Sequence, residues 1–351
     1  MDTLILTAMR DEAPYLLEWV AYHRLIGVTG FLVYSNDCAD GTDAMLDRLQ
    51  EMGLVHHVRN HPVGSKGVQW TALERARDHP ALTAADWLLV ADVDEFVNIR
   101  CGAGRLEDLL AAAPGADAIA LTWRLFGSAG RVGVEDAPVI ARFDRAAPFP
   151  CQSPWEANQF KTLYRNDGSY RRPGVHRPKG RDAGRRAPVW ANGSGHALGP
   201  EFLDDGSVTM GDMAGDALVC LNHYSVKSAE AFLVKSRRGL PNRAAKAVDI
   251  GYWVDRNFNT VQDRSIQRHL PDLAGALAEL RADPVLDRLH RAGLEWHRAR
   301  AREVMAGIEG LQLFARILGA ERHDIDPDLA RDIVARWPAA LRAGKGAGGS
   351  K

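Results

Sequence analysis

The chain of 351 residues has few cysteines and no long hydrophobic run. Its four cysteines, at positions 38, 101, 151 and 220, form no Cys-x-x-Cys pair, which argues against a zinc ribbon or a dithiol redox motif. The apolar stretch 1–8 is too short for a signal peptide, and no stretch approaches the ~20 apolar residues of a membrane span. We therefore expect a cytoplasmic protein without a transmembrane segment.

A surplus of charge of one sign is also lacking. Charged residues make up 25% of the chain, and the formal net charge is -1. Such a balance gives no general attraction to nucleic acid or to an anionic membrane surface. Any recognition of phosphate must therefore depend on a local group of side chains.

The first third of the chain alternates short apolar runs with amphipathic segments, which is typical of β-α-β units around a mainly parallel sheet. We expect strands at 3–7, 30–34, 54–58 and 87–91 and helices at 12–25, 42–52 and 67–78. Further on, we expect a helix at 106–112, strands at 118–123, 159–164 and 217–221, and helices at 266–280 and 285–318. The fold class is α/β, with a mainly parallel central sheet flanked by helices and a helical C-terminal extension. The segment 131–215 is rich in Gly, Pro, Arg and Trp and should line a site.

The sequence Asp92-Val-Asp94-Glu95-Phe96 directly follows the apolar run 87–91. Two carboxylates one residue apart leave a strand end close together, and Mn²⁺ or Mg²⁺ prefer such oxygen ligands while leaving positions open for substrate phosphates. In open α/β sheets the carboxyl ends of the strands form the edge where ligands bind. Because turns alone favour Asp after a strand, a purely structural role is the alternative.

Other polar residues follow the neighbouring strands at the same expected edge. Arg10 and Glu12 follow the first strand, Asp37 the second, and Lys66 precedes the third helix. We expect these four side chains to contact a nucleotide-diphosphate substrate. For Glu12 and Asp37 the alternatives are a first-turn dipole partner and an ordinary strand-to-helix turn.

A histidine is expected to complete the coordination left open by Asp92 and Asp94. His223 follows the strand expected at 217–221 and is the first choice, with His176 as the alternative. After His223 comes a basic cluster that could cover a departing diphosphate; a solvated helix face would look similar. This cluster consists of Lys227, Lys235, Arg237 and Arg238.

Two tryptophans are candidates for stacking against the acceptor sugar. Trp123 ends the strand expected at 118–123, and Trp190 lies in the loop-rich middle. Aromatic rings stack on the C–H faces of sugars, although most tryptophans are core residues.

Taken together, these residues resemble a known family. The run Arg10 to His23, then Ser35-Asn-Asp37, Asp92 to Phe96 and Asn222-His-Tyr224 is similar to glycosyltransferase family 2-like proteins close to family 92. The resemblance implies a GT-A fold over 1–225, with a nucleotide-sugar half at 1–100 and an acceptor-side half at 101–225. A helical extension would follow at 226–340, and a disordered tail at 341–351.

The resemblance also implies a reaction: glycosyl transfer from a nucleotide-diphosphate sugar, with UDP-sugars foremost, to a saccharide or related acceptor, as in polysaccharide biosynthesis. Mn²⁺ or Mg²⁺ would sit on Asp92, Asp94 and His223, with Asp92 also near the donor ribose. No acidic pair stands where family 2 enzymes keep the base that activates the acceptor. Glu156 is the first candidate for that base, ahead of Asp182 and Asp205.

Two other functions stay open on the sequence. A nucleotidyltransferase would normally carry a Gly-rich basic loop after the first strand, where this chain has Met9 to Pro14. A carbohydrate-binding protein on a transferase fold would bind sugar without turnover. The long helices after residue 283 could also pair two copies of the chain.

Overall fold

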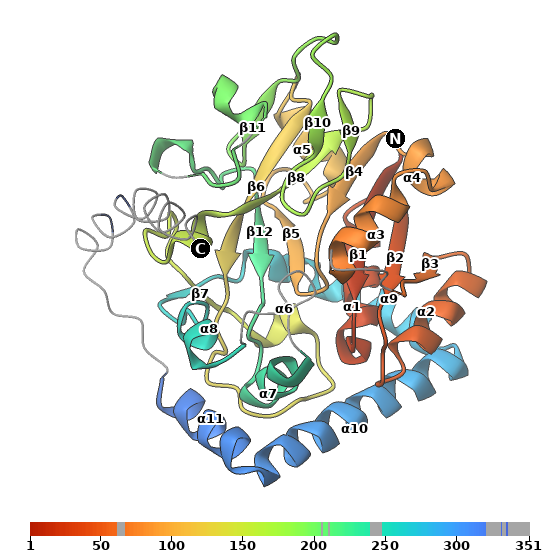
Figure 1. The fold of residues 1–351 in the computed structure, drawn as a ribbon, viewed down its shortest axis with the longest axis vertical. Coiled ribbons are helices and arrows are strands. Elements are labelled where there is room, and N and C mark those ends of the chain that lie inside the picture. Colours follow the sequence, from red (N-terminus) through yellow and green to blue (C-terminus); the bar gives the residue numbers. More distant parts are fainter. Residues whose placement is uncertain are drawn as a thin grey trace, which may run out of the picture.

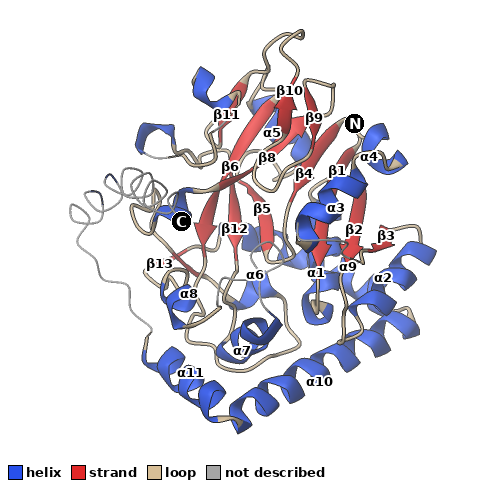
Figure 2. Ribbon diagram, viewed as in Figure 1, coloured by secondary structure: helices blue, strands red, loops and turns tan. Residues whose placement is uncertain are grey.

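The computed structural model describes residues 1–61, 67–204, 206–209, 211–238 and 248–320, together with 331 and 335. A central sheet carries helices on both faces (Figures 1 and 2). In the described part of the chain, nine strands form this sheet in the order β3-β2-β1-β4-β8-β6-β12-β5, with β11 paired to β6. The α/β fold with a central sheet expected from the sequence is confirmed.

The strands of the sheet are β1 (Thr3–Met9), β2 (Gly30–Ser35), β3 (His56–Arg59), β4 (Trp87–Val90), β5 (Glu95–Ile99), β6 (Ala118–Leu125), β8 (Phe160–Arg165), β11 (Trp190–Asn192) and β12 (Val219–His223). Two small ribbons lie beside it: β9 (Tyr170–Arg172) with β10 (Lys179–Arg181), and β7 (Arg145–Ala146) with β13 (Val261–Gln262). The helices are α1 (Ala13–Leu25), α2 (Thr42–Glu51), α3 (Val68–Ala76), α4 (Pro80–Ala84), α5 (Leu106–Ala112), α6 (Val139–Arg142), α7 (Ala229–Arg238), α8 (Ile250–Val254), α9 (Leu270–Arg281), α10 (Pro284–Ala306) and α11 (Ile308–Gly319). Short 3₁₀ turns occur at Trp155–Asn158, Pro200–Phe202, Gly211–Met213 and Ser265–His269.

The sheet is buried on both faces, which explains the continuous apolar runs of its first strands. Ile5 and Leu89 point into a core shared with α1, α2, α5 and α9. Leu4, Leu6 and Leu88 point into a second core shared with α3 and α4. Because side chains alternate along a strand, a run of apolar residues supplies both cores at once.

Strand directions place the candidate residues at one edge. Strands β1, β2, β3 and β4 are parallel, and β8 lies antiparallel between β4 and β6. Strand β6 therefore runs in the direction of β4, and β12 runs parallel to β6. The carboxyl ends of β1, β4, β6 and β12 consequently meet at the same edge, together with the amino end of β8.

The sequence missed one strand: directly after Asp92-Val-Asp94, Glu95 begins β5, which pairs antiparallel with β12. One expectation about secondary structure is wrong. The helix expected at 285–318 is two helices, because Gly307 is extended, with φ -91° and ψ 148°, between α10 and α11.

The C-terminal helices pack directly on the first half of the chain. Helix α10 runs along one side of the molecule and contacts α1, α2 and α7 (Figure 1). The approach is close at Gly293, where a Cβ would lie 2.4 Å from the Cβ of Ala13. Along the described segments, no helix has the length and apolar character needed to cross a bilayer. The domain division at residue 225 stays a prediction, and the tail expected at 341–351 lies outside the described residues.

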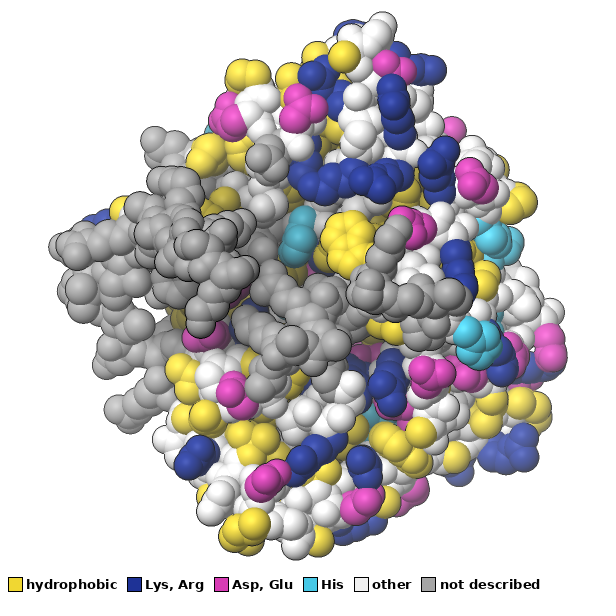
Figure 3. Space-filling model, viewed as in Figure 1, with side chains coloured by type: hydrophobic (Ala, Val, Ile, Leu, Met, Phe, Trp, Pro, Cys, Tyr) yellow, Lys and Arg dark blue, Asp and Glu magenta, His cyan; other side chains and the backbone are white. Residues whose placement is uncertain are grey.

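On the face shown in Figure 3, acidic and basic side chains are interspersed. This agrees with the balanced composition of the chain. Positive charge is concentrated instead at buried positions behind the strand ends, where the candidate site lies.

Candidate active site

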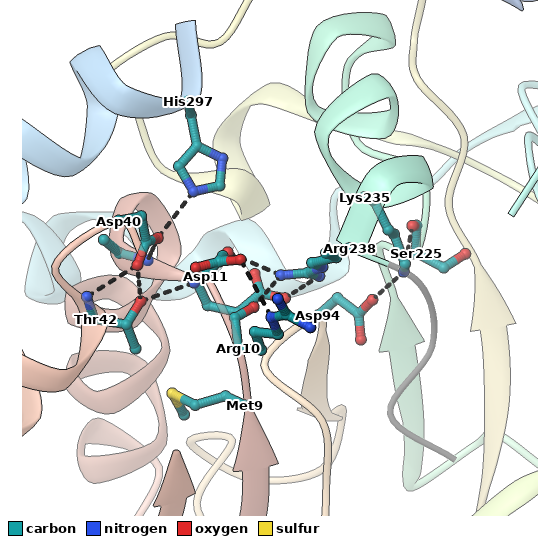
Figure 4. A network of polar contacts seen from close by, with 12 residues as sticks. Met9, Arg10, Asp11, Asp40, Thr42, Asp94, Ser225, Lys235, Arg238 and His297 are labelled. Atoms are coloured by element: carbon teal, nitrogen blue, oxygen red, sulfur yellow. Dashed lines mark hydrogen bonds and ion pairs between the residues drawn. The ribbon is translucent and has the colours of Figure 1, made fainter. Parts of the chain in front are cut away.

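Asp94 is held at the carboxyl edge by a buried lysine and a buried histidine. Its Oδ2 accepts a 2.8 Å hydrogen bond from Nζ of Lys235 on α7 (Figure 4). Its Oδ1 lies 3.6 Å from Nε2 of His223 at the end of β12. Burial alone would raise the pKa of Asp94, but Lys235, His223 and Lys227 outweigh it and hold the pKa well below its usual range. Asp94 is therefore a carboxylate at neutral pH.

His223 is an uncharged imidazole. It is 5% exposed, and burial lowers its pKa to about 3 despite the nearby Asp94 carboxylate. Its ring lies 4.4 Å from that of Trp123, and its Nδ1 is buried without a hydrogen-bond partner. A neutral imidazole beside a carboxylate is a suitable pair of ligands for a divalent ion.

Asp92 points to a different set of partners. Its Oδ2 accepts from Nζ of Lys161 at 3.1 Å, and its Oδ1 accepts from Nε2 of Gln69 at 3.2 Å. Its side chain is 32% exposed, so it is the more open member of the pair. Within the described ranges, no three His, Cys, Asp or Glu side chains gather as a metal-binding group. If a divalent ion binds at this edge, the residues that could hold it are Asp94 and His223, with Asp92 on the same loop.

Lys161 and Glu95 form a buried ion pair behind Asp92 that sequence analysis missed. Both side chains have no exposed surface, and Nζ of Lys161 lies 3.4 Å from Oε2 of Glu95. Oε2 of Glu95 also accepts from the backbone N–H of Asp92 at 2.8 Å, and Oε1 accepts from Nε1 of Trp123 at 2.7 Å. Burial would lower the pKa of Lys161, but Asp92 and Glu95 outweigh it and raise the pKa. The pair fixes the Asp92 backbone and the Trp123 ring together.

The two expected tryptophans have different roles. Trp123 lies in the site, between the rings of His223 and His176, with centroid distances of 4.4 and 5.6 Å. Trp190 is 2% exposed and donates a 2.9 Å hydrogen bond to the hydroxyl of Tyr170. The assignment of Trp190 to acceptor binding is therefore wrong: it is a core residue, and its type alone could not reveal this.

The two candidate histidines both lie near Trp123, and Nε2 of His223 lies 3.6 Å from Asp94. His176 is partly exposed, and its Nδ1 lies 3.1 Å from the carbonyl oxygen of Phe160. The geometry therefore favours His223 over His176 as the partner of Asp94.

The loop after β1 is bound to α7 through Arg238. The guanidinium of Arg238 donates to the carbonyl oxygens of Arg10 and Asp11 and forms an ion pair with Glu12 (Figure 4). Glu12 is thus buried and paired, while the Arg10 side chain is exposed, with its Nε 3.6 Å from Asp11. Glu12 shapes the loop rather than facing open solvent.

The same loop is anchored on its other side by Asp40. Oδ2 of Asp40 accepts from the backbone N–H of Ala13 at 2.8 Å and lies 2.9 Å from Nε2 of His297 on α10 (Figure 4). Burial alone would raise the pKa of Asp40, but His297 and Thr42 outweigh it and lower the pKa. Helix α10 therefore supports the start of α1 and the loop that precedes it.

Only some members of the basic cluster on and before α7 face the site. Lys235 and Arg238, three residues apart on α7, point to the strand ends. Arg237 is on the other side of the helix, 42% exposed and 3.6 Å from Glu309 of α11. The structure therefore places Lys235 and Arg238, and not Arg237, at the site.

Lys227, which precedes α7, is a further buried member of the cluster. It is 4% exposed, its Nζ lies 4.3 Å from the centroid of the Tyr15 ring, and its backbone is left-handed at φ 54°. Burial lowers its pKa, although Glu12 and Asp94 work in the opposite direction. A non-glycine residue in this strained conformation marks a place where local structure is constrained.

The remaining candidates lie at the periphery of the edge. Asp37 is exposed after β2 with φ 45°. Glu156 is partly exposed in the turn Trp155–Asn158, which leads into the amino end of β8 at the same edge. Lys66 and Asp205 lie outside the described residues.

Comparison with known proteins finds similarity to one family. Residues 7–129 match the model of glycosyltransferase family 92. A family 92 protein of Ricinus communis is 32% identical over 107 residues, which cover 29% of this chain and 18% of that protein. A family 92 protein of Oryza sativa subsp. japonica is 27% identical over 137 residues, covering 37% of this chain and 22% of that protein. The matched segment thus spans about a fifth of the length of these curated relatives.

Solved structures show weaker likenesses. Residues 1–349 of S. aureus TarS are 11% identical, with a TM-score of 0.29 over 97% of this chain and 92% of that chain. A putative glucose-1-phosphate thymidylyltransferase from Bacillus anthracis is 16% identical, with a TM-score of 0.27 over 47% of this chain and 71% of that chain. Likenesses at this level add nothing to the assignment.

The family match covers the loop at Arg10 to Glu12 and the Asp92-Val-Asp94 motif, and it ends before His223 and Lys235. The resemblance to family 92 seen in the sequence is therefore confirmed for residues 7–129.

Proposed function

We propose that the protein is a metal-dependent glycosyltransferase that takes a sugar from a nucleotide-diphosphate donor and transfers it to a saccharide-type acceptor. UDP-sugars are the first donors to test. The proposal is supported by the family match of residues 7–129 and by the buried Asp94 carboxylate, which lies between His223 and Lys235 at the carboxyl edge of the sheet. That arrangement of Asp94 is the observation on which the proposal depends.

The buried cations suit a diphosphate leaving group. Lys227 and Arg238 are both close to Asp94 and Glu12, and Lys235 is close to Asp94. These buried positive charges can help to neutralise the negative charge that grows on the diphosphate as the glycosidic bond to it breaks. In this proposal Lys227, which makes no hydrogen bond or ion pair with any described residue, is the side chain left for the phosphate oxygens.

A divalent ion would be held by Asp94 and His223, with Asp92 nearby. Mn²⁺ or Mg²⁺ at this place would supply further positive charge to the diphosphate. The Lys161–Glu95 pair keeps Asp92 and Trp123 in fixed positions behind it. Burial raises the pKa of Glu95 to about 8, but its side chain has no exposed surface, so an acceptor sugar has no direct access to it as a base. We propose Glu156, at the rim, for that step.

Enzyme assays test the proposal directly. The protein is incubated with a panel of UDP-sugars and Mn²⁺, and release of UDP is measured with and without added saccharides. Turnover should require Mn²⁺ and should be lost in Asp94→Ala. A protein that binds UDP-sugars but never releases UDP would be a binding module, and release of pyrophosphate from UTP and a sugar phosphate would indicate a nucleotidyltransferase.

Two further expectations stay predictions. The cytoplasmic location rests on the sequence alone. For a homodimer through the C-terminal helices, α11 offers exposed apolar side chains, since Ile308 and Leu311 are 68% and 50% exposed.

A further inference from the structure

Arg256, just after α8, is a buried cation without an anionic partner among the described residues. It is 7% exposed, and its Nη1 is buried without a hydrogen-bond partner. Its guanidinium carbon lies 4.1 Å from the centroid of the Tyr252 ring, and its side chain makes no hydrogen bond or ion pair with any residue in the described part of the chain. A buried charge without a counter-charge is costly, so the arrangement calls for a ligand that supplies one.

Two more unpartnered donors come from the same turn. Nε1 of Trp253 and Nδ2 of Asn257 are buried and have no hydrogen-bond partner in the part of the chain that the structure describes. The backbone N–H groups of Arg256 and Asn257 both bond to the carbonyl oxygen of Trp253, so residues 253, 256 and 257 have the helical spacing that places side chains on one face. Three donors with one positive charge on one face match an acceptor that carries negative charge.

The orientation of the Asn257 side-chain amide is fixed by the hydrogen bonds that its oxygen accepts. Its Oδ1 accepts from the backbone N–H of Ser128 at 2.7 Å and from Nδ2 of Asn259 at 3.2 Å. The amide nitrogen of Asn257 therefore has to point away from these donors, and it remains available to a ligand.

This donor group adjoins the proposed transfer site. The centroid of the Tyr252 ring, which lies 4.1 Å from the guanidinium carbon of Arg256, also lies 5.3 Å from Nζ of Lys235. Lys235 in turn binds Asp94. The negative charge of Asp94 is therefore already compensated by Lys235, and Asp94 forms no ion pair with Arg256.

We propose that Arg256, assisted by Asn257 and Trp253, binds an anionic oxygen group of a substrate beside Asp94, either a phosphate or a carboxylate. The proposal rests on the proposed glycosyl transfer and extends it to an acidic substrate. An internal water could satisfy the donors, but it would leave the charge unmatched. The planar guanidinium suits both phosphate and carboxylate oxygens. The anionic group belongs either to an acidic acceptor or to the diphosphate of the donor.

Binding measurements on the full chain test the proposal. Thermal shifts and affinities are measured with inorganic phosphate and with glucuronate, in the absence and presence of saturating UDP and Mn²⁺, for the wild type, Arg256→Gln and Arg256→Lys. If the group belongs to an acceptor, both anions raise the Tm of the UDP-saturated wild type, glucose does not, and Arg256→Gln loses the rise. If it belongs to the donor, UDP affinity falls at least tenfold in Arg256→Gln, and neither anion affects the UDP-saturated protein.

Controls separate this proposal from a structural role and from the proposed function. Arg24→Gln, at an exposed arginine of α1, should bind all ligands as the wild type does, and unliganded Arg256→Gln should melt no lower than the wild type. Equal affinities of wild type and Arg256→Gln for phosphate, glucuronate and UDP would overturn the proposal. A wild type that binds no nucleoside diphosphate would refute the transferase, while phosphate binding without a nucleotide would still distinguish Arg256→Gln from wild type.

Discussion

The ammonium of Lys235 and the carboxylate of Asp94 form a buried 2.8 Å ion pair between residues 141 positions apart in sequence. The contact joins α7 to the loop after β4 and places a positive charge at the carboxyl edge of the sheet. Removing one partner leaves the other as an uncompensated buried charge.

Asp94→Asn should therefore reduce both activity and stability. Loss of the carboxylate removes a proposed metal ligand, and it leaves Lys235 unpaired at a cost of about 3–5 kcal/mol in the free energy of unfolding. Urea denaturation and UDP release measure the two effects. The double variant Asp94→Asn/Lys235→Met should regain much of the stability but none of the turnover. Turnover near the wild-type level in Asp94→Asn would refute the proposed role of Asp94.

Replacement of Lys161 should destabilise the protein although the residue has no exposed surface. Lys161→Met leaves the Glu95 carboxylate buried without its cation, and we expect a loss of about 3 kcal/mol in the free energy of unfolding. We also expect the KM for the donor to rise, because Asp92 loses its 3.1 Å hydrogen bond from Nζ of Lys161. Urea melts and donor titrations measure these effects, and Lys161→Met/Glu95→Gln should recover most of the stability. A double variant no more stable than Lys161→Met would contradict the pairing.

His223→Ala should weaken the binding of Mn²⁺ in the absence of any substrate. The variant loses one of the two groups that stand 3.6 Å apart at the proposed metal position, and we expect at least about a tenfold loss of affinity, as for disruption of a metal's immediate surroundings. Electron paramagnetic resonance of free Mn²⁺ measures the affinity. His176→Ala is the matched control and should stay near the wild-type value; the reverse result would make His176 the ligand.

His23 should make stability depend on pH in the acid range. Its Nδ1 faces the carbonyl oxygen of Trp19 at 2.9 Å, and its Nε2 accepts from the backbone N–H of Val97 at 3.4 Å, so the buried ring is held as the neutral form. Burial lowers its pKa to about 4, from the usual 6.5. Between these values the unfolded chain binds the proton and the folded protein does not, so stability falls as the pH decreases from about 6.5 to 4.

The expected loss from His23 is roughly 3 kcal/mol, since one pKa unit corresponds to about 1.4 kcal/mol. Chemical denaturation at a series of pH values measures it. In His23→Gln the slope over this interval should become shallower, whatever the absolute stability of the variant. An unchanged slope would show that other groups cause the acid sensitivity.

The sequence predicted the part of the site that depends on local order. Strand ends follow from apolar runs, so the positions of Glu12, Asp37, Asp92 and Asp94 at one edge could be predicted without coordinates. The strand β5 could not, because Glu95 reads as the end of a polar turn, and only its pairing with β12 reveals that it begins a strand.

The rest of the site depends on contacts between distant segments. Lys161 reaches Asp92 across 69 residues, and no spacing rule connects them. Which members of the basic cluster reach the site depends on which side of α7 faces the sheet: Lys235 does and Arg237 does not. Trp190 was assigned to sugar stacking by residue type alone, and its burial beside Tyr170 overrides that reading.

Strand direction also separates the candidate bases. Because β8 is antiparallel to β4, the residues immediately before β8 lie at the site edge, as Glu156 does, and those immediately after it lie at the opposite end. Asp182 belongs to the second group: its backbone N–H bonds to Ser169, beyond the carboxyl end of β8. Glu156 and Asp182 therefore form a matched pair of carboxylates, one at the site and one remote from it.

Glu156→Gln should lower kcat by about 10²–10⁴, the range for loss of a general base, with a smaller change in donor affinity. Asp182→Asn should leave both quantities unchanged. Initial rates with saturating UDP-sugar, Mn²⁺ and acceptor measure kcat, and donor titrations measure the affinity. Because Glu156 is partly exposed, the substitution should alter stability little, so a reduced kcat would not reflect unfolding. Near-normal turnover in Glu156→Gln would exclude Glu156 as the base.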